Sequence, residues 1–232
     1  MSDVALRLAR IRERLAAAAR RSGRDPAEIA LIGASKLQPV AALTDAYAAG
    51  LRRFGENRVQ EGRTKAPALP ADVEWHLLGP LQSNKVRAAV EIFTFFHAVD
   101  RPSIADALDA EARARGKVLT GLLEVNLGGE ASKHGFAPET LAEAAAPLAA
   151  LEHLRISGLM AIPPPGDDAE ASRPWFRRLS ELRDTLAARS EWQGRLTALS
   201  MGMSDDFEVA VEEGATHVRI GTLLFGPRPP RT

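Results

Sequence analysis

Two apolar runs near the C-terminal end of the chain each end in small residues suited to binding an anion. Ser200 ends the first run, and Gly221 and Thr222 follow the second. Small residues let a ligand approach the backbone closely, and N–H groups exposed in such turns bind oxyanions. A helical pattern separates the two runs, an arrangement typical of the phosphate site formed by the last two units of an α/β barrel.

Lys36 supplies a candidate nucleophile at the end of another apolar run, residues 29–35. Burial lowers the pKa of a lysine and so favours attack on a carbonyl, although a lysine at a strand end can also extend into water. In a closed barrel the first strand adjoins the eighth, which brings Lys36 close to the phosphate site. A ligand with an aldehyde and a phosphate would span both, and pyridoxal phosphate is such a molecule.

Strand and helix patterns alternate along the chain. Short apolar or β-branched runs predict strands at 29–35, 52–55, 75–79, 95–99, 119–126, 155–161, 197–201 and 217–221. Helical spacing predicts helices at 2–21, 39–49, 58–66, 83–91, 102–115, 138–150, 169–189 and 205–213. Eight alternating units after a leading helix predict a (β/α)8 barrel, with residues 1–232 forming one domain.

Glycines, prolines and one proline-rich loop mark the connections between these elements. Pro102 and Pro138 are expected in first helical turns, and Gly50 and Gly214 at helix C-terminal caps. The loop 163–168 follows the sixth strand, where it is either a plain surface connection or a lid.

The composition narrows the function classes. The 30 basic and 30 acidic side chains cancel, so no overall field favours nucleic acid or an anionic membrane. No apolar window is long enough for a membrane span. Cysteine is absent, which excludes thiolate chemistry and is compatible with the cytoplasm. We also expect a monomer, because no added dimerisation segment is visible.

The longest motifs resemble the pyridoxal phosphate homeostasis protein family. The similarity covers residues 30–226 in order and is carried by Ala34-Ser35-Lys36, the segments 54–61, 75–85 and 158–163, and the C-terminal segment described first. It implies an alanine-racemase-like barrel that holds pyridoxal phosphate as a Schiff base on Lys36. It also implies a phosphate site made by Ser200, Gly221 and Thr222, with Arg219 facing the pyridine nitrogen and Asn57 and Met201 lining the ring.

The residues favour a holder of the cofactor over a catalyst. A permanent cation at the pyridine nitrogen discourages its protonation and makes the ring a poorer electron sink. A racemase needs a second base, and the one tyrosine, Tyr47, is expected at the opposite face of the barrel. His76, His97 and His217 lie in strand patterns and are expected in the core, and no spacing predicts a metal site.

Several functions stay open at this point. The preferred one is storage, buffering or delivery of pyridoxal phosphate, with apo-enzymes that use it as acceptors. One alternative is an amino-acid racemase that uses the same cofactor, and another is a cofactor-free Schiff-base aldolase. Lys133, in the loop after the fifth strand, is a candidate to receive or hand over the aldehyde.

Overall fold

Eight parallel strands close into a barrel in the computed structural model, which describes residues 2–130 and 134–227. Each strand pairs with the next, and β8 pairs with β1 through the register Ala30 to His217. The strands are β1 (Ala30–Ala34), β2 (Arg53–Glu56), β3 (Glu74–Leu77), β4 (Phe95–Val99), β5 (Leu119–Glu124), β6 (Leu154–Met160), β7 (Ala198–Ser200) and β8 (His217–Ile220). The predicted barrel is therefore confirmed, with strand ends shifted by a residue or two.

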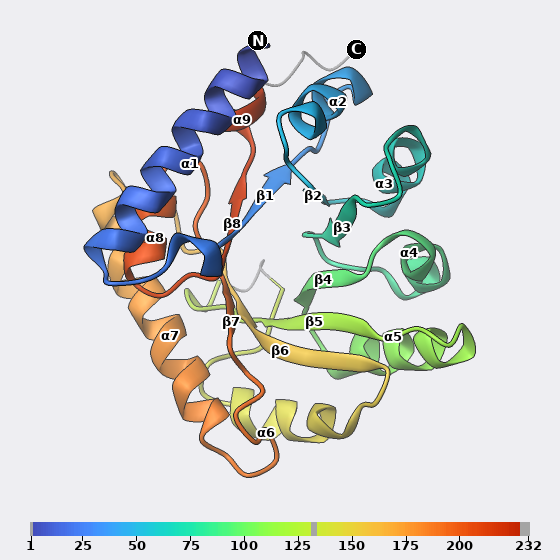
Figure 1. The fold of residues 1–232 in the computed structure, drawn as a ribbon. Helices are drawn as coiled ribbons and strands as arrows, with labels where there is room; N and C mark the ends of the chain where they lie inside the picture. Colours follow the sequence, from blue (N-terminus) through green and yellow to red (C-terminus); the bar gives the residue numbers. More distant parts are fainter. Residues whose placement is uncertain (1, 131–133, 228–232) are drawn as a thin grey trace.

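The helices form an outer ring around these strands (Figure 1). They are α1 (Asp3–Arg21), α2 (Val40–Ala48), α3 (Val59–Lys65), α4 (Val86–Ile92), α5 (Pro102–Ala114), α6 (Leu141–Ala145), α7 (Arg173–Ala187), α8 (Phe207–Glu212) and α9 (Thr222–Phe225). Short 3-10 turns are η1 (Pro26–Glu28), η2 (Ala66–Ala68), η3 (Ser83–Lys85), η4 (Ala146–Ala150) and η5 (Glu170–Ser172). In the part of the chain that the structure describes, no helix is both long and apolar enough to cross a membrane.

The helix ends test the placement of proline and glycine. Pro102 is the first residue of α5, and Gly50 and Gly214 adopt the left-handed φ values of +89° and +102° after α2 and α8. Pro138 is different: it lies in a turn, and α6 begins only at Leu141. The expectation of Pro138 in a first helical turn was wrong because the turn 138–140 precedes the helix.

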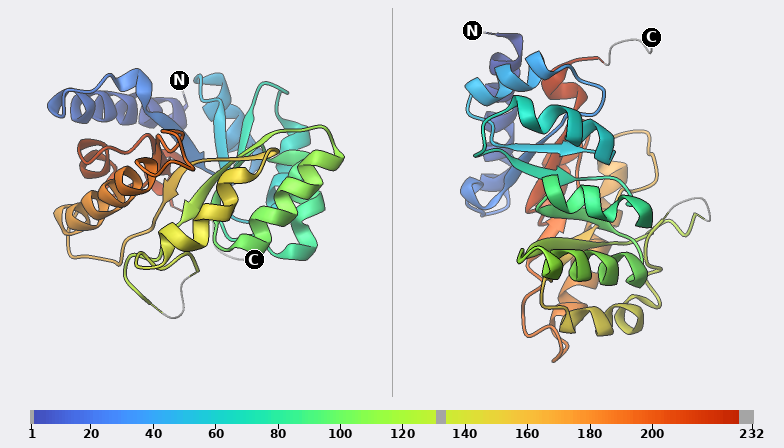
Figure 2. Two further views of the ribbon diagram at one scale, coloured as in Figure 1. Left: turned by 90° about the horizontal axis from the view of Figure 1, so that it is seen from below. Right: turned by 90° about the vertical axis from the view of Figure 1, so that its right-hand side faces the viewer.

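The leading helix α1 closes the side of the barrel where the chain begins and ends. Its apolar face repeats at helical spacing through Val4, Leu8, Ile11 and Leu15, all buried. It packs against α8 and α9, and both views of Figure 2 show this blue helix beside the red C-terminal elements. This packing holds the β8–α9 connection against the rest of the barrel.

The barrel interior carries a polar layer, where such barrels usually hold branched aliphatic side chains. His76 Nδ1 lies 2.9 Å from His97 Nε2, and His97 Nδ1 lies 2.8 Å from Ser200 Oγ. His76, His97 and Ser200 are fully buried. Burial lowers the pKa of His76 and holds that of His97 well below its usual value, so both rings are neutral at pH 7.

The proton positions in this layer follow from its two ends. Glu74 Oε1 lies 3.4 Å from His76 Nε2, and the contact with His76 holds the pKa of Glu74 at about 2. An ionised carboxylate only accepts, so we assign the ring proton of His76 to Nε2. His97 then donates from Nε2 to His76, and the Ser200 hydroxyl donates to His97 Nδ1. The layer is a one-directional chain of hydrogen bonds from Ser200 through His97 to His76, and the Nε2 of His76 faces Glu74 at 3.4 Å without forming a hydrogen bond.

The neutral His97 predicts a loss of stability in acid. Its folded pKa is depressed, so the unfolded chain binds more protons below pH 6.5, and the free energy of unfolding falls as the pH falls through that range. This one group contributes a slope of about 1.4 kcal/mol per pH unit. The free energy of unfolding, measured by urea denaturation at pH 7, 6 and 5, should depend less steeply on pH in His97→Gln, by about this amount per pH unit. Equal slopes in the two proteins would contradict the assignment.

Candidate functional site

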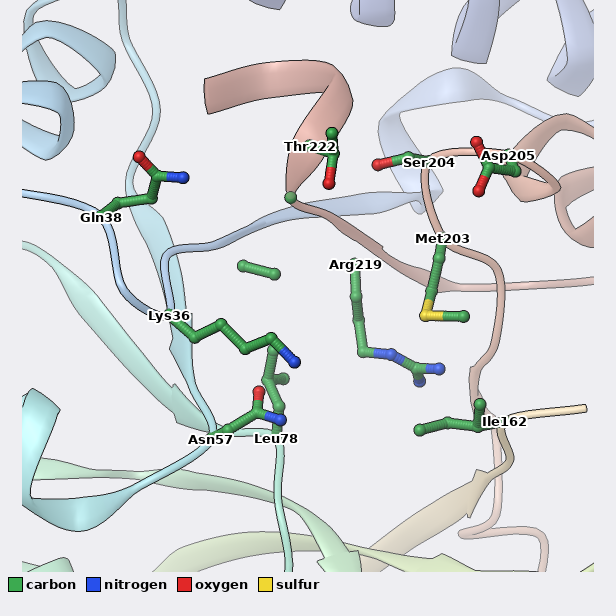
Figure 3. Close-up of a pocket in the computed structure, with 12 residues that line it drawn as sticks. Lys36, Gln38, Asn57, Leu78, Ile162, Met203, Ser204, Asp205, Arg219 and Thr222 are labelled. Atoms are coloured by element: carbon green, nitrogen blue, oxygen red, sulfur yellow. The ribbon is translucent and has the colours of Figure 1, made fainter. Parts of the chain in front are cut away.

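A cavity of about 310 Å³ opens at the carboxyl ends of the strands (Figure 3). Its walls come from the ends of β1, β2, β3, β6, β7 and β8, which the barrel brings to one rim. The lining residues are Ala34, Lys36, Gln38, Asn57, Leu78, Ile162, Met203, Ser204, Asp205, Arg219, Gly221 and Thr222. Figure 3 shows the Lys36 amine pointing into the cavity, with the Asn57 amide beside it.

Most of the residues expected to bind a cofactor meet in this cavity. Those that line it are Lys36, Asn57, Arg219, Gly221 and Thr222. Ser200 and Met201 do not line it. The Ser200 side chain is fully buried against His97 and Arg219, and Met201 is fully buried in the apolar core. Neither side chain reaches the cavity, and the roles expected for them at the phosphate and the ring stay predictions.

Ser204, and not Ser200, brings a serine side chain from the β7 connection to the cavity. Gly202 turns the chain after β7 with φ +90°, and a Cβ on it would come within 2.5 Å of the Ala210 Cβ. The turn carries Ser204 to the cavity, where its side chain lies beside that of Thr222 (Figure 3). Ser204 Oγ also accepts the Leu223 amide at 3.2 Å, at the start of α9. In the sequence, Ser204 is indistinguishable from a helix N-cap.

Arg219 is a cation almost entirely buried in the cavity wall. Its Nη1 donates to the Ser200 carbonyl at 2.8 Å and to Ser200 Oγ, and its Nη2 donates to the Ala161 carbonyl at 3.1 Å. Burial lowers its pKa to about 10, so the guanidinium is charged at neutral pH. Among the described residues no carboxylate forms an ion pair with it, and the Nε–H and one Nη2–H have no acceptor. These two donors are available to a ligand.

The backbone around Lys36 is held in a strained turn. Leu37, the next residue, has a left-handed φ of +62°, a conformation that costs a side-chain-bearing residue of order 1 kcal/mol or more. Its amide donates to Glu61 Oε2 at 2.7 Å. A carboxylate on α3 therefore stabilises the turn that directs Lys36 into the cavity.

Lys65, from the end of α3, fixes the other side of that turn. Its Nζ donates to the Ser35 carbonyl at 2.8 Å, to Glu56 Oε1 at 2.7 Å and to Glu61 Oε2 at 3.0 Å. Ser35 Oγ also donates to Glu56 Oε1 at 2.7 Å. We call Glu56, Glu61 and Lys65 the α3 clamp. It joins the residues on either side of Lys36 to one buried ion-pair cluster.

Two further residues considered in the sequence lie elsewhere. Tyr47 donates its hydroxyl to Asp72 at 2.8 Å and stacks on the Arg52 guanidinium, at the amino end of the barrel. Its expected position away from the site is confirmed. Lys133 lies outside the described residues, and its role stays a prediction.

The α3 clamp predicts a large stability loss on removing Lys65. Burial raises the pKa of Glu56, and without Lys65 this carboxyl would be an uncompensated buried acid. Lys65→Met should lower the free energy of unfolding by about 3 kcal/mol. Lys65→Met combined with Glu56→Gln should recover most of that loss, because the stranded charge is then absent. Urea denaturation measures the free energy of unfolding of both variants. A double variant as unstable as Lys65→Met would show that the loss of stability does not come from the ion pair.

The family comparison agrees with the geometry. Residues 6–229 match the model of the alanine racemase N-terminal domain. A pyridoxal phosphate homeostasis protein of Aquifex aeolicus is 47% identical over 96% of this chain and 97% of that protein. The proteins of the same name from Pseudomonas aeruginosa and Escherichia coli K12 are 47% and 42% identical, each over 98% of this chain and over 97% and 98% of their own lengths.

The comparison with solved structures agrees with the comparison of sequences. PipY of Synechococcus elongatus with pyridoxal phosphate bound superposes with a TM-score of 0.85, at 42% identity, over 97% of this chain and all of that one. An alanine racemase of Clostridium difficile shares the fold, with a TM-score of 0.67 at 15% identity, over 88% of this chain but 53% of the racemase. The chain therefore belongs to the pyridoxal phosphate homeostasis proteins, a family built on the alanine racemase N-terminal domain.

Proposed function

We propose that this protein binds pyridoxal phosphate as a Schiff base on Lys36 and takes part in its storage, buffering or delivery. The observation that carries the proposal is one cavity lined by an amine, a buried cation and two neighbouring hydroxyl side chains. PipY, which is similar over nearly the whole chain, has been solved with pyridoxal phosphate bound. We also propose that residues 1–232 are one domain, monomeric and cytoplasmic, and that apo-enzymes requiring the cofactor are its acceptors.

The residues present fit this cofactor at three points. Pyridoxal phosphate brings an aldehyde that condenses with a primary amine, a pyridine nitrogen that accepts a hydrogen bond, and a phosphate. Lys36 supplies the amine, and the unused N–H donors of Arg219 supply the partner for the nitrogen. Ser204 and Thr222 supply hydroxyls for the phosphate, and Gly221 lets it approach the backbone.

Arg219 favours retention of the cofactor over turnover. The guanidinium stays charged at neutral pH and cannot accept a proton, so it stabilises an unprotonated pyridine nitrogen opposite it. Of the described residues that line the cavity, only Lys36, Asp205 and Arg219 carry titratable groups. Tyr47 is engaged with Asp72 at the other end of the barrel. The cavity therefore offers no tyrosine to serve as the second base of a racemase.

The absorption spectrum tests the binding proposal. Protein supplied with pyridoxal phosphate should show a visible band that borohydride abolishes, and Lys36→Ala should lose it. Lys117→Ala, which removes a lysine outside the cavity, should keep the band. A band that survives in Lys36→Ala would place the Schiff base on another lysine. A protein that stays colourless would favour the cofactor-free aldolase.

Chiral analysis tests whether the loaded protein is a holder or a racemase. After incubation with each L-amino acid we expect no D-enantiomer above the level produced by free pyridoxal phosphate. Racemisation that disappears in Lys36→Ala would establish the enzyme alternative instead.

A further inference from the structure

A second cavity opens on the same rim, beside the first. It has a volume of about 720 Å³ and shares Asn57 with the candidate cofactor cavity. The connections β2–α3 and β3–α4 form much of it. Every charged side chain that lines it is basic or can become so: Arg58, Lys85, Arg101 and His134. Of the residues that the structure describes, no aspartate or glutamate lines it, although the whole chain has equal numbers of acidic and basic residues.

Arg101 is fixed in the wall of this cavity. Its Nη1 donates to Asp100 Oδ1 at 2.7 Å and to Oδ2 at 2.8 Å, and its Nη2 donates to the Leu81 carbonyl at 3.3 Å. The Asp100 side chain is only 2% exposed, so it binds the guanidinium on the side that faces the protein interior. Asp100 cancels the charge of Arg101 but leaves its planar donor group at the cavity.

Arg58 and Lys85 supply the uncompensated charge. Arg58 directly precedes α3, and Lys85 ends η3 just before α4. Neither forms an ion pair with a residue in 2–130 or 134–227. The barrel places the ends of β2 and β3 next to each other, since Glu56 pairs with Leu77. Two cations from different connections therefore face one cavity without an acidic partner.

We propose that this second cavity binds a small phosphate monoester. A phosphate monoester is close to a dianion at neutral pH, which matches the two uncompensated cations of Arg58 and Lys85. Arg101 offers a fixed guanidinium fork for phosphate oxygens, and the amides of Gln60 and Gln82 add uncharged donors. The site is separate from Lys36 and does not depend on the function proposed for the first cavity.

Calorimetric titration with inorganic phosphate at constant ionic strength tests the proposal. The protein is first loaded with pyridoxal phosphate and then dialysed free of cofactor not bound to Lys36, so that the anion cannot enter the Lys36 cavity and the second cavity is empty. Saturable binding should weaken about tenfold or more in Arg58→Gln/Lys85→Gln. The matched control is Arg63→Gln/Arg87→Gln, which removes two exposed cations from α3 and α4 that do not line the cavity. This control should change the affinity by less than about twofold.

Three results would overturn the site. One is the absence of saturable phosphate binding to a wild-type protein. Another is an equal loss of phosphate affinity in Arg58→Gln/Lys85→Gln and in the control Arg63→Gln/Arg87→Gln, which would indicate general attraction to surface charge. The third is binding that is lost in Ser204→Ala/Thr222→Val but kept in Arg58→Gln/Lys85→Gln, which would place the anion in the first cavity. Urea unfolding of each variant confirms that it is folded. If Lys36 does not hold pyridoxal phosphate, the same titrations on the unloaded protein still decide this inference.

Discussion

The constraint on which the rest of the structure depends is the burial of the Arg219 guanidinium, which no carboxylate within residues 2–130 and 134–227 contacts. Two backbone carbonyls and the Ser200 hydroxyl solvate the charge, which occupies three of its N–H donors. Ser200 then donates its own hydroxyl hydrogen to His97, and His97 donates to His76, whose Nε2 faces Glu74. The Ser200 hydroxyl that solvates Arg219 needs an acceptor of its own, which accounts for the polar His97 in the barrel interior.

Lys36 is positioned by a separate group of residues, the α3 clamp, on the outside of the barrel. The α3 clamp grips the peptides before and after Lys36, while the lysine side chain itself points into the cavity. Arg219 is positioned from the interior and Lys36 from the flank, so the two groups that face a ligand are fixed independently. The hydrogen bonds of Arg219 and the α3 clamp both involve buried charges, and leaving such a charge without a partner destabilises the fold. The geometry of the site therefore depends on the same contacts as the stability of the fold.

The fold could be predicted from the sequence because the eight strands and the longer helices each show a local pattern of apolar residues. Apolar runs of strand length and helical spacing need no long-range information. The α9 helix was missed since four residues are too short to show a period, and Pro138 misled because a proline fits a turn as well as a first helical turn. The α3 clamp was equally invisible: the sequence does not show that Lys65 and Glu56 are neighbours.

The sequence by itself determined the chemistry available: a lysine at the end of the first strand, an arginine inside the last one, and small residues after the last two. It also determined the barrel that brings them to one rim. Only the tertiary structure decided that Ser204 and not Ser200 reaches the cavity. That choice depends on the tight turn at Gly202 against Ala210 and on the demand of Arg219 for the Ser200 hydroxyl. Both are contacts between segments whose packing no local pattern encodes.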